Sequence, residues 1–261
     1  MSEGNGRERL RLHLETPDWT SQLTLSVPSE PAPIETWLPL LHTLANQAAQ
    51  LASEAAERAG KRVSCKKGCG ACCRQLVAIS LVEAGALAKL VAAMPEPRQS
   101  EIRQRFARAA RRFAEISAPE RGDAGGEAAV DSPLIESDRS NLGAAWFSQQ
   151  IACPFLENES CAIHESRPLV CREYQVTSPS EGCARLYRGP VEPIDISVRL
   201  GQSLARATAE IASIPVATIP IVMALEWSGK IEAALSSRHD AIRMLEILLG
   251  EIGDWRIEKA Q

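Results

Sequence analysis

Aromatic side chains and excess positive charge are both scarce in this 261-residue sequence. Aromatic residues make up only 4% of the chain, which leaves little material for a surface that stacks on nucleic-acid bases. Acidic residues outnumber basic ones, and the formal net charge of −4 gives no overall positive field to attract DNA or RNA. We therefore expect no nucleic-acid partner.

Long hydrophobic runs are missing as well. The most apolar stretch without a formal charge, residues 211–225, is interrupted by Pro215 and Pro220, so it is not expected to span a bilayer. The residues that follow Met1 are polar and lack the apolar segment of a signal peptide. These absences predict a cytoplasmic protein that has no membrane partner.

Cysteine, by contrast, is abundant, with eight residues in a chain whose other composition is ordinary. The sequence is 45% hydrophobic and 24% charged, as expected for a globular protein with a sizeable core. Cytoplasmic thiols are kept reduced, so closely spaced cysteines there favour metal ligands over disulfides.

Hydrophobic periodicity predicts a mostly α-helical fold. An apolar stripe at three-to-four spacing favours a helix over residues 34–60 that ends at Gly60. Ser80 followed by Glu83 is a capping-box pattern, which predicts a second helix that continues to about Met94. The same reasoning predicts helices at about 99–116, 196–213, 219–228 and 236–251.

The remaining segments lack helical periodicity. Weak alternation at 9–15 and 21–27 predicts an arm or a short β-hairpin. Residues 117–140 are rich in Gly, Ala, Pro, Asp and Ser and are expected to form a loop or flexible insertion. Residues 150–192 combine four cysteines with several prolines and should be irregular. No fixed-period repeat and no alternating βαβ pattern occurs.

These segments suggest three parts of the chain. Residues 1–33 would form the N-terminal arm or short hairpin, and residues 34–192 a small helical domain around an irregular cysteine-rich metal centre. Residues 193–261 would form a C-terminal helical region that packs on this domain.

The first four cysteines fall within nine residues in the pattern C-x3-C-x2-C-C. They are Cys65, Cys69, Cys72 and Cys73. On a continuous helix their thiols would form a buried apolar stripe, which is the structural alternative to a metal site. Gly68 and Gly70 weaken a helix and allow tight turns, so the pattern favours thiols that converge on a metal.

The other four cysteines are spaced more widely. They are Cys153, Cys161, Cys171 and Cys183. Beside the first group they become strong candidates, because an irregular segment needs an internal cross-link. We therefore predict that all eight cysteines are metal ligands, in one site or a pair of sites that joins the two segments. Such a site would close the long loop between Cys73 and Cys153.

Basic residues flank both groups of cysteines. Lys66, Lys67 and Arg74 lie beside the first group, and Arg167 and Arg172 bracket Cys171. Their positive charge is expected to lower the pKa of the thiols and to offset the negative charge of a thiolate-bound metal.

The ligand type limits the metal. Thiolate ligands suit zinc or an iron–sulfur cluster and exclude magnesium and calcium. Structural zinc sites usually contain paired C-x2-C motifs, whereas this chain has one, Cys69 to Cys72. The adjacent Cys72 and Cys73 do not easily bind one tetrahedral ion together. They suit a polynuclear centre, or one ligand beside a neighbour in a second site, so an iron–sulfur cluster of the [4Fe–4S] type is favoured over zinc.

Other signals of chemistry are weaker. His164 lies between Cys161 and Cys171 and could replace a cysteine ligand, although a solvated loop histidine is the commoner case. The third predicted helix is basic, which is typical of a solvated face, with Phe106 and Phe113 pointing inward.

The spacing from Cys65 to Cys72 also matches the cysteine motif of radical S-adenosylmethionine enzymes. That fold needs repeated β and α units, which this sequence lacks, and Cys73 would crowd the open coordination position.

The stretch from Cys65 to Cys73, with a second from Cys153 through Cys161 and Arg167 to Cys171, resembles a known family. The chain is similar over about residues 62–185 to the YkgJ-type cysteine-cluster proteins, whose CxxxCxxCC domain is described as zinc- or iron-chelating. This resemblance implies metal binding and a mostly helical small domain. One branch of the family is similar to flagellin lysine N-methylase, so the resemblance also suggests lysine N-methylation as an alternative activity.

Three functional hypotheses remain open. The first is a metal-binding protein for redox chemistry or metal handling, and the second is a protein-lysine methylase-like enzyme. The third is a structural zinc protein whose metal only supports a partner-binding surface. The sequence contains no recognisable S-adenosylmethionine site, which disfavours the enzyme, and whether the protein catalyses a reaction stays open.

Overall fold

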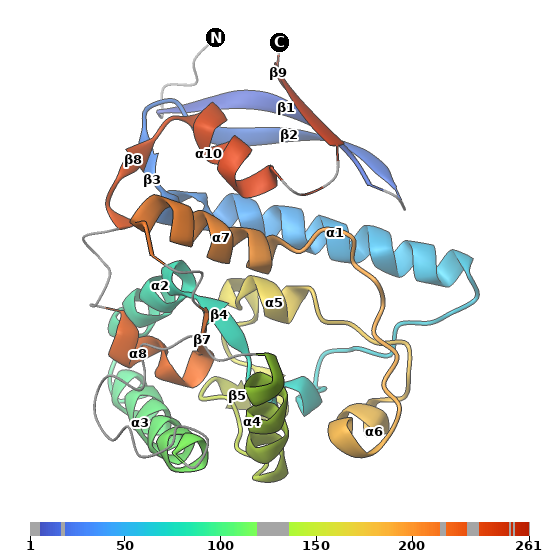
Figure 1. Cartoon of the computed structure of the whole chain (residues 1–261), viewed down its shortest axis with the longest axis vertical. Helices are drawn as coiled ribbons and strands as arrows, with labels where there is room; N and C mark the ends of the chain where they lie inside the picture. Colours follow the sequence, from blue (N-terminus) through green and yellow to red (C-terminus); the bar gives the residue numbers. More distant parts are fainter. Residues whose placement is uncertain are drawn as a thin grey trace.

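Helices form most of the computed structural model, which describes residues 6–16, 19–118, 136–214, 218–228, 235–250, 252 and 254–260, with 136–140 described by their backbone alone (Figure 1). This confirms the mostly α fold class. The longer helices are α1 (Leu38–Arg58), α2 (Leu81–Ala92), α3 (Arg98–Ser117), α4 (Glu136–Ser148), α7 (Leu200–Ala212) and α10 (Ala241–Leu249). Three single-turn helices are α5 (Leu169–Arg172), α6 (Ser180–Cys183) and α8 (Ala224–Trp227).

The expected N-terminal hairpin is present and is part of a three-stranded antiparallel sheet. Strands β1 (Arg7–Glu15) and β2 (Thr20–Pro28) pair along their whole lengths. The third strand, β9 (Asp254–Lys259), comes from the end of the chain and pairs with β1 on its other edge. The sequence analysis did not predict this strand in the C-terminal region. Every other sheet in the described part of the chain has two strands and is antiparallel, so no parallel barrel of the radical-enzyme type is present there.

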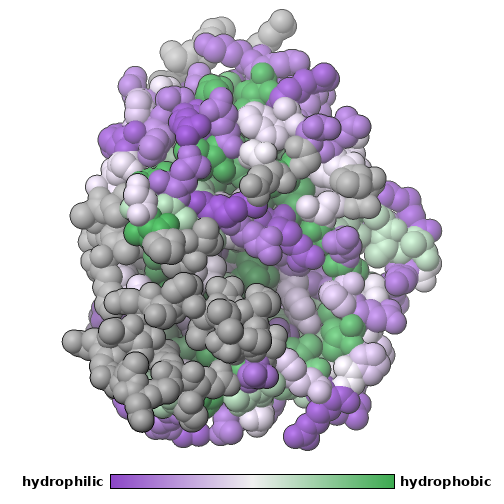
Figure 2. Space-filling view, viewed as in Figure 1, coloured by the Kyte–Doolittle hydropathy of each residue, from purple (hydrophilic) through white to green (hydrophobic). Residues whose placement is uncertain are grey.

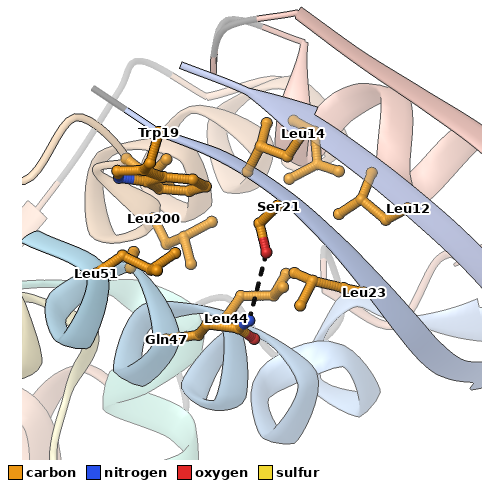
Figure 3. A pocket seen from close by; sticks show the side chains of 12 residues that line it. Leu12, Leu14, Trp19, Ser21, Leu23, Leu44, Gln47, Leu51 and Leu200 are labelled. Atoms are coloured by element: carbon orange, nitrogen blue, oxygen red, sulfur yellow. Dashed lines mark hydrogen bonds between the residues drawn. The ribbon is translucent and has the colours of Figure 1, made fainter. Parts of the chain in front are cut away.

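One hydrophobic core lies between this sheet and the helices below it, α1, α7 and α10 (Figure 1). Alternate residues of β1, such as Leu12, point into the core because side chains on a strand alternate between its two faces. Figure 3 shows a small void in this core, about 10 Å³, where Trp19 faces Leu51 and Gln47 donates a hydrogen bond of 3.4 Å to Ser21. The void has room for at most one water molecule.

A second hydrophobic core packs α2, α3 and α4 against the pair β4 (Ala78–Ser80) and β7 (Thr218–Pro220). Phe106 and Phe113 of α3 are buried in it, which confirms that the basic helix turns its aromatic residues inward. Phe106 makes an edge-to-face contact with Phe155, so this core extends to the segment between Cys153 and Cys161.

Three of the six predicted helices match the structure closely. The first predicted helix, which starts with the 3₁₀ turn η1 (Ile34–Trp37), the second with its capping box and the third all match the structure within a few residues. Gly60 follows α1 with a φ of +76°, as expected for a glycine that ends a helix.

Four predictions need correction, one of which is the helix expected at 236–251, because α10 begins only at Ala241. Of the expected loop 117–140, residues 119–135 lie outside the described residues and residues 136–140 are helical, within α4. The predicted helix at 196–213 begins only at Leu200. The predicted helix at 219–228 is β7 followed by the 3₁₀ turn η7 (Ile221–Met223) and α8, because proline at 220 cannot continue a helix.

Between Ser236 and Leu249, only α10 is helical. A two-residue strand, β8 (Arg238–His239), precedes it and pairs with β3 (Ala32–Pro33). On the face in Figure 2, hydrophilic side chains cover much of the end of the molecule that carries the sheet. No helix in the described parts of the chain is long and apolar enough to cross a bilayer.

Candidate metal centre

The two cysteine segments lie side by side, although they are far apart in the sequence. The backbone N–H of Cys153 donates a hydrogen bond of 2.7 Å to the carbonyl oxygen of Cys73. Ser64, just before Cys65, donates from its backbone N–H to Val176 at 2.9 Å and from its hydroxyl to the Ser178 carbonyl at 2.5 Å. The 3₁₀ turn η2 (Ala71–Arg74) packs against α6, which ends at Cys183. All eight cysteines are free thiols.

A tight hairpin carries Cys161. Its strands are β5 (Leu156–Glu157) and β6 (Ser160–Cys161), and Asn158 and Glu159 between them both have positive φ, the turn that matches the twist of a two-residue hairpin. Gly70 lies against this hairpin, and a Cβ atom there would be 2.6 Å from Glu159 Oε2. Glycine at this position therefore lets the first cysteine segment approach the second, and the φ of +86° at Gly68 provides the turn before it.

Ion pairs fix the hairpin to its neighbours. Arg74 donates two hydrogen bonds to the carboxylate of Glu159, of 3.0 and 2.6 Å, which is the bidentate geometry of a strong Arg–carboxylate pair. Arg105 of α3 donates to Glu157 at 2.7 Å, and Arg98 pairs with the same carboxylate. These arginines hold the pKa of Glu157 below its usual value, Arg98 most strongly. Sequence reasoning missed this role of the basic helix.

A buried polar frame positions the segment that carries Cys171. The Glu83 carboxylate is 3% exposed and accepts hydrogen bonds from the backbone N–H groups of Ser80, at 2.9 Å, and Leu169, at 2.8 Å. It thereby caps α2 and α5 at once. Burial raises the pKa of Glu83, and the two backbone donors oppose that rise. Cys171 lies in the turn of α5 that this carboxylate anchors.

Arg172 holds the turn between Cys161 and Cys171. Its guanidinium is buried and donates to the carbonyl oxygens of Arg167, at 3.0 Å, and Glu165, and to Asn46 Oδ1 of α1, at 2.9 Å. Because these acceptors come from two separate segments, Arg172 fixes the loop against α1. Sequence reasoning treated Arg172 only as a cation beside a thiolate, and its local sequence carries no signal of these longer contacts.

Three of the thiols form one set of mutual neighbours, namely Cys65, Cys69 and Cys183. Burial raises the pKa of Cys183, and the nearby Cys65, Cys69 and Cys72 raise it further. Burial likewise raises the pKa of Cys65, and Cys72 and Cys69 add to that rise. The first segment thus supplies two thiols of this set and the second segment supplies one.

Three other thiols form a second set, namely Cys153, Cys161 and Cys171. Burial raises the pKa of Cys153 to about 12, with Cys161 and Cys72 contributing. Burial also raises the pKa of Cys171 well above its usual value, and the largest further contributions come from Cys153 and Cys72. Cys161 is likewise close enough to raise it.

Cys72 lies between the two sets. Its charge affects the pKa of five of the six thiols just described, and its own pKa is raised by a hydrogen bond with Cys73 and then by burial. Cys72 and the six thiols of the two sets therefore form one neighbourhood, and Cys73 follows Cys72 directly in the chain. In Figure 1, the labelled α5, β5 and α6 lie around the short segment between α1 and β4 that carries this pair.

The described residues contain no group of three or more His, Cys, Asp or Glu side chains arranged tightly enough to hold a metal ion. The thiols are neighbours without converging on one point, and metal binding is commonly coupled to the folding of its site. One buried donor near them, Arg167 Nε, has no hydrogen-bond partner in the described part of the chain. An orphaned donor beside a thiol-rich region fits an anionic centre whose sulfur atoms accept hydrogen bonds.

The expected effect of the flanking cations is wrong. The pKa is raised, not lowered, at Cys65, Cys72, Cys153, Cys161, Cys171 and Cys183. Burial dominates at five of these thiols, while Lys66 and Lys67 are exposed and Arg74 is paired with Glu159. Arg167 does lower thiol pKa values, at Cys65, Cys72 and Cys161, and Arg172 also lowers that of Cys161.

His164 is exposed in the structure and begins the 3₁₀ turn η5 (His164–Ser166). Its Nε2 atom lies 2.7 Å from Arg167 Nη1, and burial followed by the charge of Arg167 lowers its pKa. This exposure fits the solvated histidine that the sequence favoured over a metal ligand.

Comparison with known proteins identifies the region that contains these thiols. Residues 64–188 match the family CxxCxxCC, described as "Putative zinc- or iron-chelating domain". Just under half of the chain is thus similar to this family's domain. The match confirms the suspected cysteine-cluster family and supports metal binding in general. No curated protein and no solved structure matches the chain. The CxxCxxCC domain contains all eight cysteines and the residues of the polar frame that follow Cys153.

A histidine beside the polar frame predicts a pH effect on stability. Burial, and then the charge of Arg172, lowers the pKa of His42 from 6.5 to about 4. The folded state therefore favours neutral His42, so its contribution is complete above about pH 6.5 and is lost as the pH falls toward 4. Because His42 is only partly buried, solvent screening keeps the loss below the roughly 3 kcal/mol that the full shift would give at about 1.36 kcal/mol per pKa unit.

The measurement compares the unfolding free energy of the wild type and His42→Gln between pH 7.5 and 4. We expect the wild type to lose stability relative to His42→Gln as the pH falls, because only the wild type takes up a proton at residue 42 on unfolding. Parallel curves across this range would contradict the proposed environment of His42.

Proposed function

We propose that this protein binds iron in its CxxCxxCC domain as a cysteine-ligated iron–sulfur centre and works in redox chemistry or metal handling. The observation that carries the proposal is the gathering of thiols from both cysteine segments around Cys72. The family description supports chelation of zinc or iron, and the choice of iron–sulfur is our inference.

Two features favour a polynuclear iron–sulfur centre over one zinc ion. The first is the adjacent pair Cys72 and Cys73, because one tetrahedral ion does not easily take both. The second is the buried donor Arg167 Nε, which has no hydrogen-bond partner among the described residues. Hydrogen bonds to cluster sulfur atoms are one of the means by which proteins set the potential of such a centre.

The roles of the chain's own residues follow from their positions. The eight cysteines would hold the metal, and a bound cluster would supply one-electron chemistry. Arg167 would offset negative charge, as it already does for Cys65, Cys72 and Cys161. Glu83 and Arg172 position the segments, and they do not touch the metal in this proposal. Cys65 is exposed, so one side of the centre would be open to a redox partner or to metal exchange.

The test is anaerobic purification followed by iron, zinc and acid-labile sulfide analysis and an absorption spectrum. We expect iron and sulfide in equal amounts and a broad thiolate-to-iron band near about 400 nm. Anaerobic handling is essential because exposed clusters oxidise and emptied thiol sites then collect zinc. Colourless protein that carries stoichiometric zinc after this procedure would reject the iron–sulfur proposal and favour a structural zinc site.

A further inference from the structure

The number of thiols exceeds what one centre needs. A [4Fe–4S] cluster or a structural zinc ion takes four thiolates, whereas the chain brings eight free cysteines to one region. How the eight are shared therefore becomes a structural question, and the sequence order does not answer it.

Two backbone contacts bring parts of the second cysteine segment to η2. Cys65 and Cys69 lie on the loop before η2, and α6, which carries Cys183, packs against η2. Cys153 instead hydrogen-bonds to the carbonyl of Cys73, at 2.7 Å, and its segment leads into the β5–β6 hairpin that carries Cys161.

The proximities among the thiols define two sets of three. Within each set of three, every thiol is an electrostatic neighbour of the other two. Cys72 is the thiol that is a neighbour of members of both sets. Three thiols plus one from the adjacent pair make a complete tetrathiolate site on each side.

The conformation of the adjacent pair allows it to serve both sides. Cys72 and Cys73 lie in the 3₁₀ turn η2, where successive residues are rotated by about 120° because a turn contains three residues. Their Cβ atoms therefore leave the backbone in different directions, while the two sulfur atoms remain close enough for a hydrogen bond. Two sites that each took one of these thiols would be adjacent.

We propose that the eight cysteines form two neighbouring four-cysteine metal sites, joined through the pair Cys72 and Cys73. One site contains Cys65, Cys69 and Cys183, the other contains Cys153, Cys161 and Cys171, and each takes its fourth ligand from the pair. This inference rests on the proposed metal-binding function and adds to it the stoichiometry and the ligand sets. Each site contains thiols from both cysteine segments, so each one ties the segments together.

The test counts metal in single-cysteine variants of the full chain. Reduced, metal-free protein is titrated with Zn²⁺, and separate samples are isolated anaerobically for iron and sulfide analysis. We expect the wild type to bind two Zn²⁺, and Cys65→Ser and Cys161→Ser to bind one each, half of the wild-type content. The variant that combines both changes should lose tight binding. If each site holds a [4Fe–4S] cluster, the wild type carries about eight iron atoms per chain.

Matched controls change a hydroxyl beside each set and leave all eight thiols in place. Ser160 lies next to Cys161, and Ser180 lies at the start of α6. The variants Ser160→Ala and Ser180→Ala should both keep the full metal content. Cys65 is the exposed thiol of its set, so its replacement should disturb packing least. Cys183→Ser then provides a second variant of the same site.

Three results would overturn the two-site assignment. They are a wild type that binds one metal ion or one cluster, a single variant that loses all its metal, and a single variant that loses none. The wild-type stoichiometry decides the question even if a variant does not fold. Two equal zinc sites in anaerobic protein would keep the two-site assignment and reject the iron–sulfur proposal. One iron–sulfur cluster that disappears in both Cys65→Ser and Cys161→Ser would support the iron–sulfur proposal and reject the two-site assignment.

Discussion

Replacing Cys171 with Ser is expected to remove at least half of the bound metal and to lower the melting temperature by on the order of 10 °C. A ligand present at about a thousand times its dissociation constant stabilises the folded state by about 4 kcal/mol. For a chain of this size, each kcal/mol corresponds to about 2–4 °C. Cys171 lies among Cys153, Cys161 and Cys72, so its loss leaves those thiols without a complete site.

The measurement is metal content and thermal unfolding of Cys171→Ser and the wild type, each with and without prior metal removal. Because the predicted effect acts through the metal, the difference in melting temperature should shrink strongly once both proteins are metal-free. Cys69→Ser should also lose metal and stability, since that cysteine belongs to the other segment. Full metal content and unchanged melting in Cys171→Ser would contradict a site shared between the two segments.

The fold was predictable where the signal is local. The apolar stripe of α1 and the capping box at Ser80 and Glu83 place helices that the structure confirms. The strand β9 was missed because its pairing partner, β1, lies at the opposite end of the chain. A short alternation such as Trp255 and Ile257 becomes a strand only when another strand edge is available to it.

The candidate ligands were predictable from their spacing, and their grouping was not. The pattern C-x3-C-x2-C-C presents Cys65, Cys69, Cys72 and Cys73 as one unit. In the structure Cys183 of the second segment is an electrostatic neighbour of Cys65 and Cys69, while Cys72 is also a neighbour of Cys171. Proximity between distant segments depends on packing, and packing leaves no trace in cysteine spacing.

The residues that position the ligands were missed for a related reason. Glu157 and Glu159 lie between two cysteines, which is a visible signal, but their arginine partners come from α3 and from the end of η2. The thiol pKa values were expected to be lowered and are raised instead. Neighbours in the sequence indicate nearby charges, whereas burial, which raises these pKa values, depends on the fold.

Glu83→Ala is expected to destabilise the protein by on the order of 3 kcal/mol and to weaken metal binding as well. The change leaves the backbone N–H groups of Ser80 and Leu169 buried without their acceptor, and each such loss costs about 1–3 kcal/mol. The Ser80 hydroxyl, which donates to the same carboxylate at 2.8 Å, loses its acceptor too. Since Leu169 begins the turn that carries Cys171, freeing it loosens a thiol of the centre.

Chemical unfolding and metal titration of Glu83→Ala, Glu83→Gln and Glu101→Ala separate this role from a general effect of removing a carboxylate. Glu101 is also an acidic residue in the first turn of its helix, but it is exposed, so its replacement should change the unfolding free energy by less than about 0.5 kcal/mol. Glu83→Gln keeps one acceptor oxygen, so it should fall between the wild type and Glu83→Ala. If Glu83→Ala unfolds like Glu101→Ala, or loses stability while its metal affinity stays at the wild-type value, then Glu83 does not connect α2 to the segment that carries Cys171.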